Sequence, residues 1–345
     1  MTLPRLLIEG NRLTTSAGAA AIALRGVNVS GLQHRRPEAG ESWRHASGID
    51  ADLLPWLADH GATVVRVPLS QDWVLGRDHA RAGEAYLDEL DALVTQGNAA
   101  GMYVVLCLHC LGWRDAGASR QPYLPPLPDE DSVIFWRTLA ARFGARPGVL
   151  FDLLNEPHGA PARAWHAWVR RLVGELLSDG GRGLLSQNTP VPLFVVSGIG
   201  GPCWSSDLSS FPVRESDDAA SPPLPNLVYS SHIYRHGSRW RGRRGHTLNA
   251  RGWSRLVDAT ARGYPVFVGE WGAGEELRDE RWTRELLAFL DERGIGWAAW
   301  SVGDRPHIVD RARGPRALTT HGARVMAALR AGRRGVAMKP LRDAG

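Results

Sequence analysis

Short apolar runs and amphipathic stretches alternate along most of the chain. The apolar runs are rich in Val, Ile, Leu and aromatic residues, which is typical of strands buried on both faces. The stretches between them carry apolar residues at intervals of three and four, which predicts helices with one face on a core. Eight strands are expected, within residues 21–31, 62–68, 102–109, 151–154, 192–197, 226–234, 266–272 and 295–301.

Helices are expected between these strands, near residues 50–61, 87–94, 133–143, 165–176, 253–261, 282–294 and 325–329. Asp50 is placed to cap the first helix, and Gly61 is placed to end it. Ahead of this series, Gly10-Asn11 between apolar residues predicts a small hairpin. Residues 198–225 are rich in Gly, Ser and Pro, which predicts mostly loop.

The residues at the predicted strand ends recur at intervals of roughly 30 to 47 positions, about the size of one βα unit. They are Asn28, Arg66, His109, Glu156, Ser197, His232, Glu270 and Trp300. This repetition predicts an α/β fold, a single (β/α)8 TIM barrel whose active site lies at the carboxyl ends of the strands. A doubly wound open sheet is the alternative, but no Gly-x-Gly-x-x-Gly turn follows the first strand.

Length and composition favour one large domain over two. The chain has 345 residues and 43% hydrophobic content, which is enough for one large core. We expect residues 1–20 to form an N-terminal hairpin packing on the barrel, residues 21–332 to form the catalytic barrel, and residues 333–345 to form a basic C-terminal tail.

Basic residues exceed acidic ones, with 41 Lys and Arg against 36 Asp and Glu. A basic balance raises the question of nucleic acid as a partner. The arginines are scattered, however, and neither a base-stacking motif nor a concentrated basic face is present, so no nucleic-acid partner is expected. The 14 Trp against 7 Phe are more informative, because indole rings suit sugar stacking as well as core packing.

Nothing in the sequence predicts a membrane partner or a disulfide framework. No apolar run is long enough to span a bilayer, and the apolar patch near the N-terminus ends at Glu9, too early for a secretory signal. As it stands the chain is expected to be a cytoplasmic monomer, or a secreted protein if a leader has been removed. Three cysteines argue against disulfide pairing, and Cys107 and Cys110, despite their redox-motif spacing, are expected to be buried or loop thiols.

Two glutamates carry the candidate chemistry. Glu156 ends an apolar run at Asn155-Glu156-Pro157, where proline cannot continue the strand. Glu270 ends a second apolar run, Val266-Phe-Val-Gly-Glu270, and lies beside glycines. Two carboxylates on separate strands of one barrel can flank a glycosidic bond, with one protonating the leaving oxygen and one attacking the anomeric carbon.

With these residues assembled, the chain resembles glycoside hydrolase family 5, the cellulase-type retaining glycosidases of clan A. The resemblance runs from Leu24-Arg-Gly-Val-Asn28 to Trp300, nearly the whole chain. It implies that Glu156 is the acid/base and Glu270 the nucleophile. It also implies substrate-binding or supporting roles for Asn28, Arg66, His109, Asn155, His232, Tyr234 and Trp300.

The residue types suit this chemistry. A retaining mechanism needs two carboxyl groups ~5–5.5 Å apart, one protonated and one charged. Arg66 and the Tyr234 hydroxyl are expected to favour the ionised form of Glu270, while Glu156 has less cationic support. Asn155 is suited to bind a sugar 2-hydroxyl. By the resemblance, His232 contacts Glu156, His109 binds sugar hydroxyls, and Trp300 is the stacking floor.

The expected function is therefore a retaining glycoside hydrolase of β-glycosidic bonds, with a β-1,4-glucanase favoured and an oligo- or polysaccharide as its partner. A β-mannanase, an exo-β-glucosidase and a non-catalytic carbohydrate-binding barrel are the alternatives. His109, His232 and a glutamate also resemble a metal set, but no helix carries His-x-x-x-His, so neither metal nor cofactor is expected. The Arg-rich residues 235–246 follow strand six and suggest either a solvated loop or an extension toward an anionic or aromatic aglycone.

Overall fold

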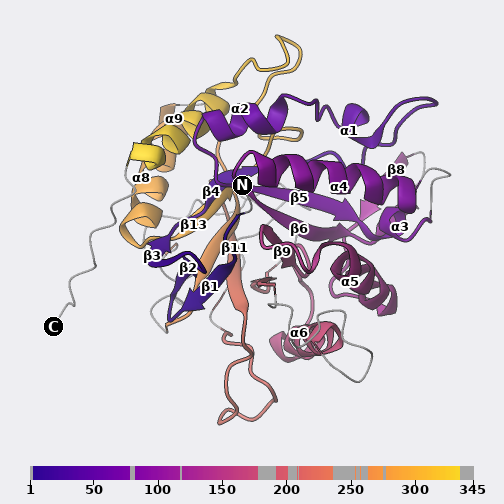
Figure 1. Cartoon of the computed structure of the whole chain (residues 1–345), viewed down its shortest axis with the longest axis vertical. Coiled ribbons are helices and arrows are strands. Elements are labelled where there is room, and N and C mark those ends of the chain that lie inside the picture. The colour runs from indigo at the N-terminus through magenta and orange to yellow at the C-terminus, as the bar shows by residue number, and fades with distance from the viewer. Residues whose placement is uncertain are drawn as a thin grey trace.

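The computed structural model describes residues 3–77, 82–116, 119–177, 192–200, 208, 210–235, 253, 257, 263–274 and 277–334. Its centre is a closed barrel in which every neighbouring pair of strands is parallel (Figure 1). In chain order the strands are β4 (Arg25–Asn28), β5 (Val64–Ser70), β6 (Tyr103–Cys110), β9 (Val149–Asp152), β10 (Phe194–Ser197), β11 (Leu227–Tyr234), β12 (Val266–Gly272) and β13 (Gly296–Ala299). Because β13 pairs with β4, the predicted (β/α)8 barrel is confirmed.

Helices cover the outside of the barrel (Figure 1). The longer ones are α2 (Leu53–Asp59), α4 (Glu84–Ala99), α5 (Glu130–Phe143), α6 (Ala162–Leu177), α8 (Leu277–Glu292) and α9 (Thr320–Arg334), and α1 (Trp43–Ala46) and α3 (Gln71–Val74) are short. At α5 a reciprocal capping box joins Asp129 and Ser132, and the helix then buries Phe135, Trp136 and Leu139 against the strands. The apolar spacing of three and four residues thus marks the face that each helix buries.

The predicted cap of α2 is wrong. The helix begins at Leu53 after Asp52, which makes no side-chain cap hydrogen bond. Asp50 instead accepts a hydrogen bond from the Asp52 N–H, 3.0 Å away and ahead of the helix. Its carboxylate also pairs with Arg316, so a distant contact competes with the local one.

The barrel interior is divided along its axis. The half nearer the amino ends of the strands, here called the lower half, is an apolar cluster. The strands contribute to it Val64, Tyr103, Val105, Leu150, Val195, Val228, Phe267 and Ala298. Side chains on a strand alternate, so the residues two positions further along point to the same side. In β5, β6, β9 and β11 these next residues are Arg66, Cys107, Asp152 and Ser230. The interior therefore changes from apolar to polar toward the carboxyl ends of the strands.

The N-terminal segment closes the lower end of the barrel. The predicted hairpin is confirmed as β1 (Leu6–Glu9) and β2 (Arg12–Thr15), and an unpredicted third strand, β3 (Gly18–Ile22), joins it. Leu6 and Leu13 are buried in the apolar cluster of the barrel interior. The first barrel strand begins only at Arg25, and β3 spans residue 20, where the two predicted segments meet.

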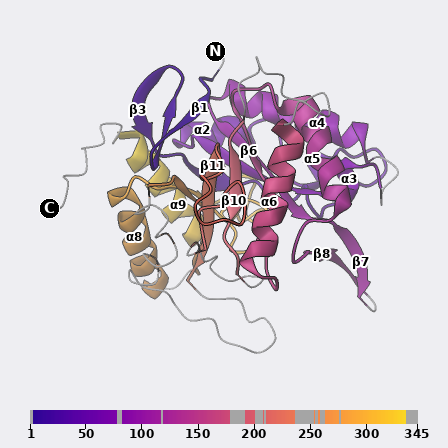
Figure 2. The ribbon, with the colours of Figure 1, turned by 90° about the horizontal axis from the view of Figure 1, so that it is seen from below.

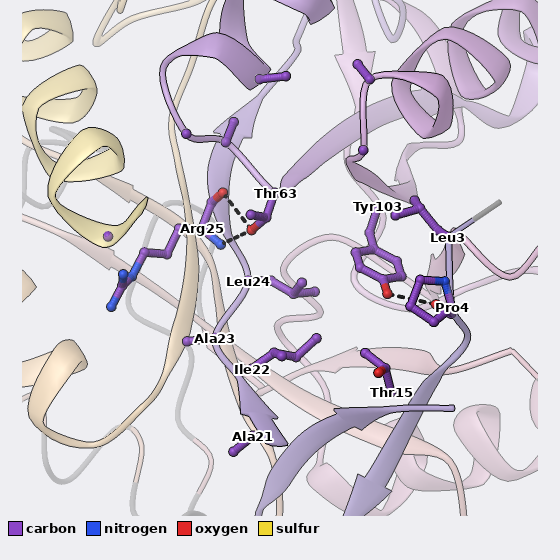
Figure 3. A pocket seen from close by; sticks show the side chains of 16 residues that line it. Leu3, Pro4, Thr15, Ala21, Ile22, Ala23, Leu24, Arg25, Thr63 and Tyr103 are labelled. Carbon is purple, nitrogen blue, oxygen red and sulfur yellow. Dashed lines mark hydrogen bonds between the residues drawn. The ribbon is translucent and has the colours of Figure 1, made fainter. Parts of the chain in front are cut away.

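A cavity of about 500 Å³ separates part of this sheet from the barrel (Figure 3). Leu3, Pro4, Ile22, Leu24 and Tyr103 line it, and the Tyr103 hydroxyl donates to the carbonyl of Pro4 across 2.7 Å. Its walls belong to the end of the barrel opposite the polar half. The cavity is therefore not part of the candidate active site.

Strands β7 (Gly112–Ala116) and β8 (Ser119–Tyr123) form a second hairpin that was not predicted. In Figure 2 this hairpin and the N-terminal sheet lie at opposite ends of the molecule. Their sequences, Gly-Trp-Arg-Asp-Ala and Ser-Arg-Gln-Pro-Tyr, lack the apolar alternation of a half-buried strand. Backbone pairing alone reveals them.

Some predictions fall outside the described residues. These are most of the helix near residues 253–261, most of the Arg-rich segment 235–246, and most of the tail 333–345. Among the described helices, none has the length and apolarity that crossing a bilayer requires. The division into three segments at residues 20 and 332 stays a prediction.

Candidate active site

Glu270 lies on β12 and is nearly buried, with 3% of its surface exposed. Its two carboxylate oxygens have different donors. Arg66 Nη1 donates to Oε1 across 2.6 Å, and the Tyr234 hydroxyl donates to Oε2 across 2.7 Å. These two contacts fix both oxygens and hence the orientation of the carboxylate.

Arg66 is the hub of the polar half of the barrel and is fully buried. Its guanidinium nitrogens donate to five side chains at 2.6 to 3.0 Å, those of Asn28, Cys107, Asp152, Asn155 and Glu270. Burial opposes the charge, but the nearby carboxylates of Asp152 and Glu270 raise the pKa of Arg66 above its ordinary value. A permanently charged group thus lies directly behind Glu270.

Glu156 follows β9 and has only 9% of its surface exposed. Its backbone has φ of 47°, in the left-handed region that L-residues other than Asn and Asp seldom occupy. Such a conformation costs on the order of 1 kcal/mol and occurs where surrounding structure enforces it. Here the preceding residue is held by its N–H, which donates to the Leu108 carbonyl on β6 across 2.9 Å.

His232 lies between the two glutamates and is fully buried. Its Nδ1 is 2.9 Å from Glu156 Oε1 and 3.5 Å from Glu270 Oε2. The closest ligand-type atoms of the three side chains all lie within 4.8 Å of one another. The two carboxylates therefore face each other across a gap that a sugar ring's reacting atoms can span.

Tyr234 ends β11, two residues after His232, so strand alternation puts both on one side. Burial and the nearby carboxylates of Glu270 and Glu156 raise its pKa well above the ordinary value for tyrosine. The phenol consequently keeps its proton and acts as a donor to Glu270.

His109 and Trp300 form a nearly parallel stack beside the glutamates. Their ring centroids are 5.6 Å apart and the planes differ by 17°. Burial lowers the pKa of His109 to about 3, so its imidazole is neutral at ordinary pH. The backbone of Trp300 is held at the end of β13 by its N–H bond to the Trp271 carbonyl and by a contact of its own carbonyl with His321.

The structure brings together all nine predicted site residues, and Asn28 is one of those with a supporting position. Asn28 is fully buried, donates to the Gly269 carbonyl across 2.9 Å and accepts from Arg66. It therefore supports Arg66 and β12 from within the barrel. Asn155 uses its side-chain oxygen to accept from Arg66, which leaves its amide nitrogen as the donor for a ligand.

Two residues of this cluster were not predicted. Asp152 is fully buried and accepts from Arg66 Nε across 2.7 Å, and Cys107 lies 3.0 Å from Arg66 Nη2. Burial raises the pKa of the Cys107 thiol well above its ordinary value, so it is neutral. A single charged residue within the apolar run 149–154 was the available signal, because a buried carboxylate requires a partner.

Glu156, His232 and Glu270 could hold a metal ion by spacing alone. The donor set argues against this use, because Arg66 already occupies one oxygen of Glu270 and its charge repels a cation. Tyr234 occupies the other oxygen. Hydrogen bonding within the site therefore uses the atoms that a metal would need.

The sequence model of the cellulases, glycosyl hydrolase family 5, matches residues 16–306 of this chain. The chain belongs to this family. Its two buried glutamates, their histidine bridge and the closed barrel are thus parts of a family 5 protein.

Sequence comparison finds curated relatives that are named endoglucanases. Endoglucanase N of Pectobacterium atrosepticum is 26% identical over 312 residues, covering 87% of this chain and 58% of the relative. Endoglucanase E-5 of Thermobifida fusca is 25% identical over 291 residues, covering 82% of this chain and 52% of the relative. The chain thus spans about half the length of the curated relatives it matches.

Solved structures share the fold. The β-glucanase SdGluc5_26A of Saccharophagus degradans superposes with a TM-score of 0.70 at 18% identity, covering 96% of this chain and 95% of that one. The same protein has been solved in complex with cellotetraose. The catalytic domain of endoglucanase Cel5A from Thermobifida fusca gives a TM-score of 0.67 at 20% identity, covering 94% and 97%.

Proposed function

We propose that this protein is a retaining β-glycosidase, in which Glu270 is the nucleophile and Glu156 the acid/base, and that it hydrolyses β-1,4-glucan. The observation that carries the proposal is the pair of buried carboxylates joined by His232, with contact atoms within 4.8 Å of one another. Retaining glycosidases need carboxyl groups only ~5–5.5 Å apart, whereas inverting ones need ~6.5–9.5 Å for an intervening water.

In the first step Glu270 attacks the anomeric carbon while Glu156 gives its proton to the glycosidic oxygen. The bond from the anomeric carbon to that oxygen breaks, and a glycosyl ester of Glu270 forms. Contacts with Arg66 and Tyr234 orient the attacking carboxylate, so little rearrangement is needed. Arg66 and Tyr234 can stay in contact with the Glu270 oxygens as the carboxylate becomes an ester and loses its charge.

In the second step Glu156 accepts a proton from water, which attacks the same anomeric carbon and displaces Glu270. His232 Nδ1 contacts Glu156 Oε1 across 2.9 Å and keeps this side chain over the gap in both steps. Two inversions at one carbon give net retention of configuration.

The neighbouring groups suit a neutral sugar. The amide of Asn155 can donate to a hydroxyl, and a contact with the 2-hydroxyl strengthens as oxocarbenium character develops. The Trp300 ring, stacked on His109, supplies a flat apolar surface on which a pyranose face can pack. The preference for β-1,4-glucan is drawn from the relatives named endoglucanases and the cellotetraose bound to the S. degradans β-glucanase.

Replacing each glutamate by alanine separates the two roles. Glu270→Ala and Glu156→Ala should each lower turnover on glucan by roughly 10³-fold or more, since each removes a group from the reaction. With an activated aryl glycoside, azide should rescue Glu270→Ala and give the inverted glycosyl azide. Azide with Glu156→Ala should give the retained azide, because Glu270 still forms the ester.

The measurement is NMR of the products, together with hydrolysis of glucans, mannans, xylans and aryl glycosides by the unaltered protein. Glu175→Ala is the matched control, because Glu175 is a partly exposed residue of α6 in an ion pair with Arg137. Near-normal rates in either active-site variant, or inversion by the unaltered protein, would refute the mechanism. Faster turnover of mannan than of glucan would leave the proposed mechanism intact and would make mannan the preferred substrate.

A further inference from the structure

A second cavity, of about 760 Å³, lies in the loops that follow β13 and β4. Its wall comes mostly from residues 302–312, and the chemically notable side chains are Arg35, Arg305, His307, Asp310, Arg311 and Thr319. All of these residues follow the carboxyl ends of barrel strands, so the cavity opens on the same end of the barrel as the glutamates.

The cavity adjoins the candidate active site. Its lining begins at Val302, two residues after Trp300, and Pro306 of the same loop packs against Gly272, two residues after Glu270. A Cβ on Gly272 would lie 2.7 Å from Pro306 Cγ, so the loop rests directly on the end of β12. A saccharide bound over Trp300 can therefore extend into the cavity.

Two arginines of the lining, Arg305 and Arg311, make no ion pair within the part of the chain that the structure describes. Arg311 instead donates to the carbonyl of Ser47 across 2.8 Å and lies over Gly48, whose φ of 66° and missing Cβ make room for the guanidinium. Burial and the nearby charge of Arg35 lower the pKa of Arg311.

The acidic groups nearby do not balance this charge. Asp304 is shared by His34 Nε2 at 3.2 Å and Arg35 at 3.8 Å, and although burial opposes its charge, hydrogen bonding to His34 lowers its pKa to about 2. Asp310 in the lining accepts a hydrogen bond from the Ala312 N–H. Counted with Asp304, which pairs with Arg35, three arginines face two aspartates, so the cavity wall keeps an excess of one positive charge.

We propose that this cavity binds the carboxylate of an acidic sugar unit, in a saccharide whose neutral units occupy the cleft between Glu156 and Glu270. The proposal rests on the proposed glycosidase function and names a substrate class for it. A guanidinium fork matches a carboxylate in a bidentate contact, and an arginine without an ion pair gives up no existing partner to form one.

The test compares two soluble glucans with the same degree of substitution, one carboxymethylated and one hydroxyethylated. The measured quantity is the ratio of kcat/KM on the charged glucan to kcat/KM on the neutral one. Arg305→Gln removes an exposed arginine of the lining and should lower this ratio about 3- to 10-fold. Raising the NaCl concentration should lower the ratio of the unaltered protein and have less effect on the variant.

Arg313→Gln is the matched control, because Arg313 is exposed in the same loop and does not line the cavity. Its ratio should equal that of the unaltered protein. An unchanged ratio in Arg305→Gln would overturn the proposal. An equal fall in both variants would overturn it too, because the effect would then come from the net charge of the surface and not from the cavity.

Affinity electrophoresis in gels that contain each glucan separates this proposal from the glycosidase function. Stronger retardation by the carboxymethyl glucan, lost in Arg305→Gln but not in Arg313→Gln, supports the cavity even if neither glucan is hydrolysed. Equal retardation of all three proteins by the charged glucan would overturn it, whatever their activity.

Discussion

At the scale of single residues, Asp152 illustrates how a side chain that does not face the substrate can govern one that does. It binds Arg66 Nε, while Arg66 Nη1 binds Glu270, so the guanidinium is held between two buried carboxylates. Removing one of them leaves Arg66 compensated by the other alone. Buried charge pairs are sensitive to this change because little water is present to replace the lost partner.

We therefore expect Asp152→Asn to lower kcat/KM roughly 10- to 100-fold through misplacement of Arg66 and Glu270. The loss should appear in kcat more than in KM, because Asp152 acts through the position of Glu270 and is itself fully buried. Steady-state kinetics give both quantities. Asp131→Asn, which breaks the surface ion pair with Arg77, should change neither, and a raised KM with an unchanged kcat would contradict this role of Asp152.

At this scale the sequence was informative where chemistry and strand ends coincide. Glu156, Glu270 and His232 each end or follow a strongly apolar run, and Arg66 interrupts one, so the barrel topology brings them together. Asn28 shows the limit of such reasoning, since its position at a strand end does not reveal that its side chain is used inside the barrel. That distinction depends on distances between strands that are far apart in sequence.

At the scale of elements, α9 holds the stacking surface in place through one buried histidine. His321 is fully buried, its Nε2 lies 2.9 Å from the Trp300 carbonyl, and its ring meets Trp271 edge-on. Burial lowers the pKa of His321 to about 4. The unfolded chain, with an ordinary histidine pKa near ~6.5, binds this proton more readily than the folded one.

The folded pKa is depressed, so the unfolded state takes up the proton between about pH 6.5 and pH 4, and stability falls as pH falls through this window. From pH 7 to pH 4.5 this single group should cost roughly 2 to 3 kcal/mol. We expect His321→Gln to reduce the pH dependence of the unfolding free energy by about that amount in urea titrations. The exposed His45→Gln should leave the pH dependence unchanged, and an unchanged slope in His321→Gln would show that this histidine is not the source.

Elements were predicted well where one face is buried and poorly where pairing is not marked by apolar residues. The eight barrel strands were found because both of their faces are buried. Strand β3, with the sequence Gly-Ala-Ala-Ala-Ile, and the β7–β8 hairpin gave no comparable signal. Their existence depends on backbone partners, which local sequence does not encode.

At the scale of the whole molecule, the N-terminal sheet and the active site occupy opposite ends of one barrel. Leu6 and Leu7 are adjacent on β1 but have 3% and 42% of their surfaces exposed, because strand residues alternate between faces. Leu6 packs into the apolar cluster that fills the lower barrel. The sheet thus contributes to the same core as the strands that carry the site.

We expect Leu6→Ala to lower the free energy of unfolding by roughly 2 to 3 kcal/mol, since it removes buried methyl groups and leaves a cavity. Leu7→Ala, on the exposed face, should change it by less than about 0.5 kcal/mol. Denaturant titration measures both, and kcat on glucan at low temperature should be the same in both variants. A smaller effect for Leu6 than for Leu7 would show that the sheet is not part of the barrel core.

The change from apolar to polar side chains along the barrel axis also bears on how such a protein can diversify. The filled lower half supplies cohesion without touching a ligand, whereas the loop after β13 combines the exposed Arg305 with the buried Ile308 and Val309. Exchanges of exposed side chains on the rim can therefore alter which ligand is accepted while the chain still folds. New specificities can arise at one end of the protein because the other end keeps a reserve of stability.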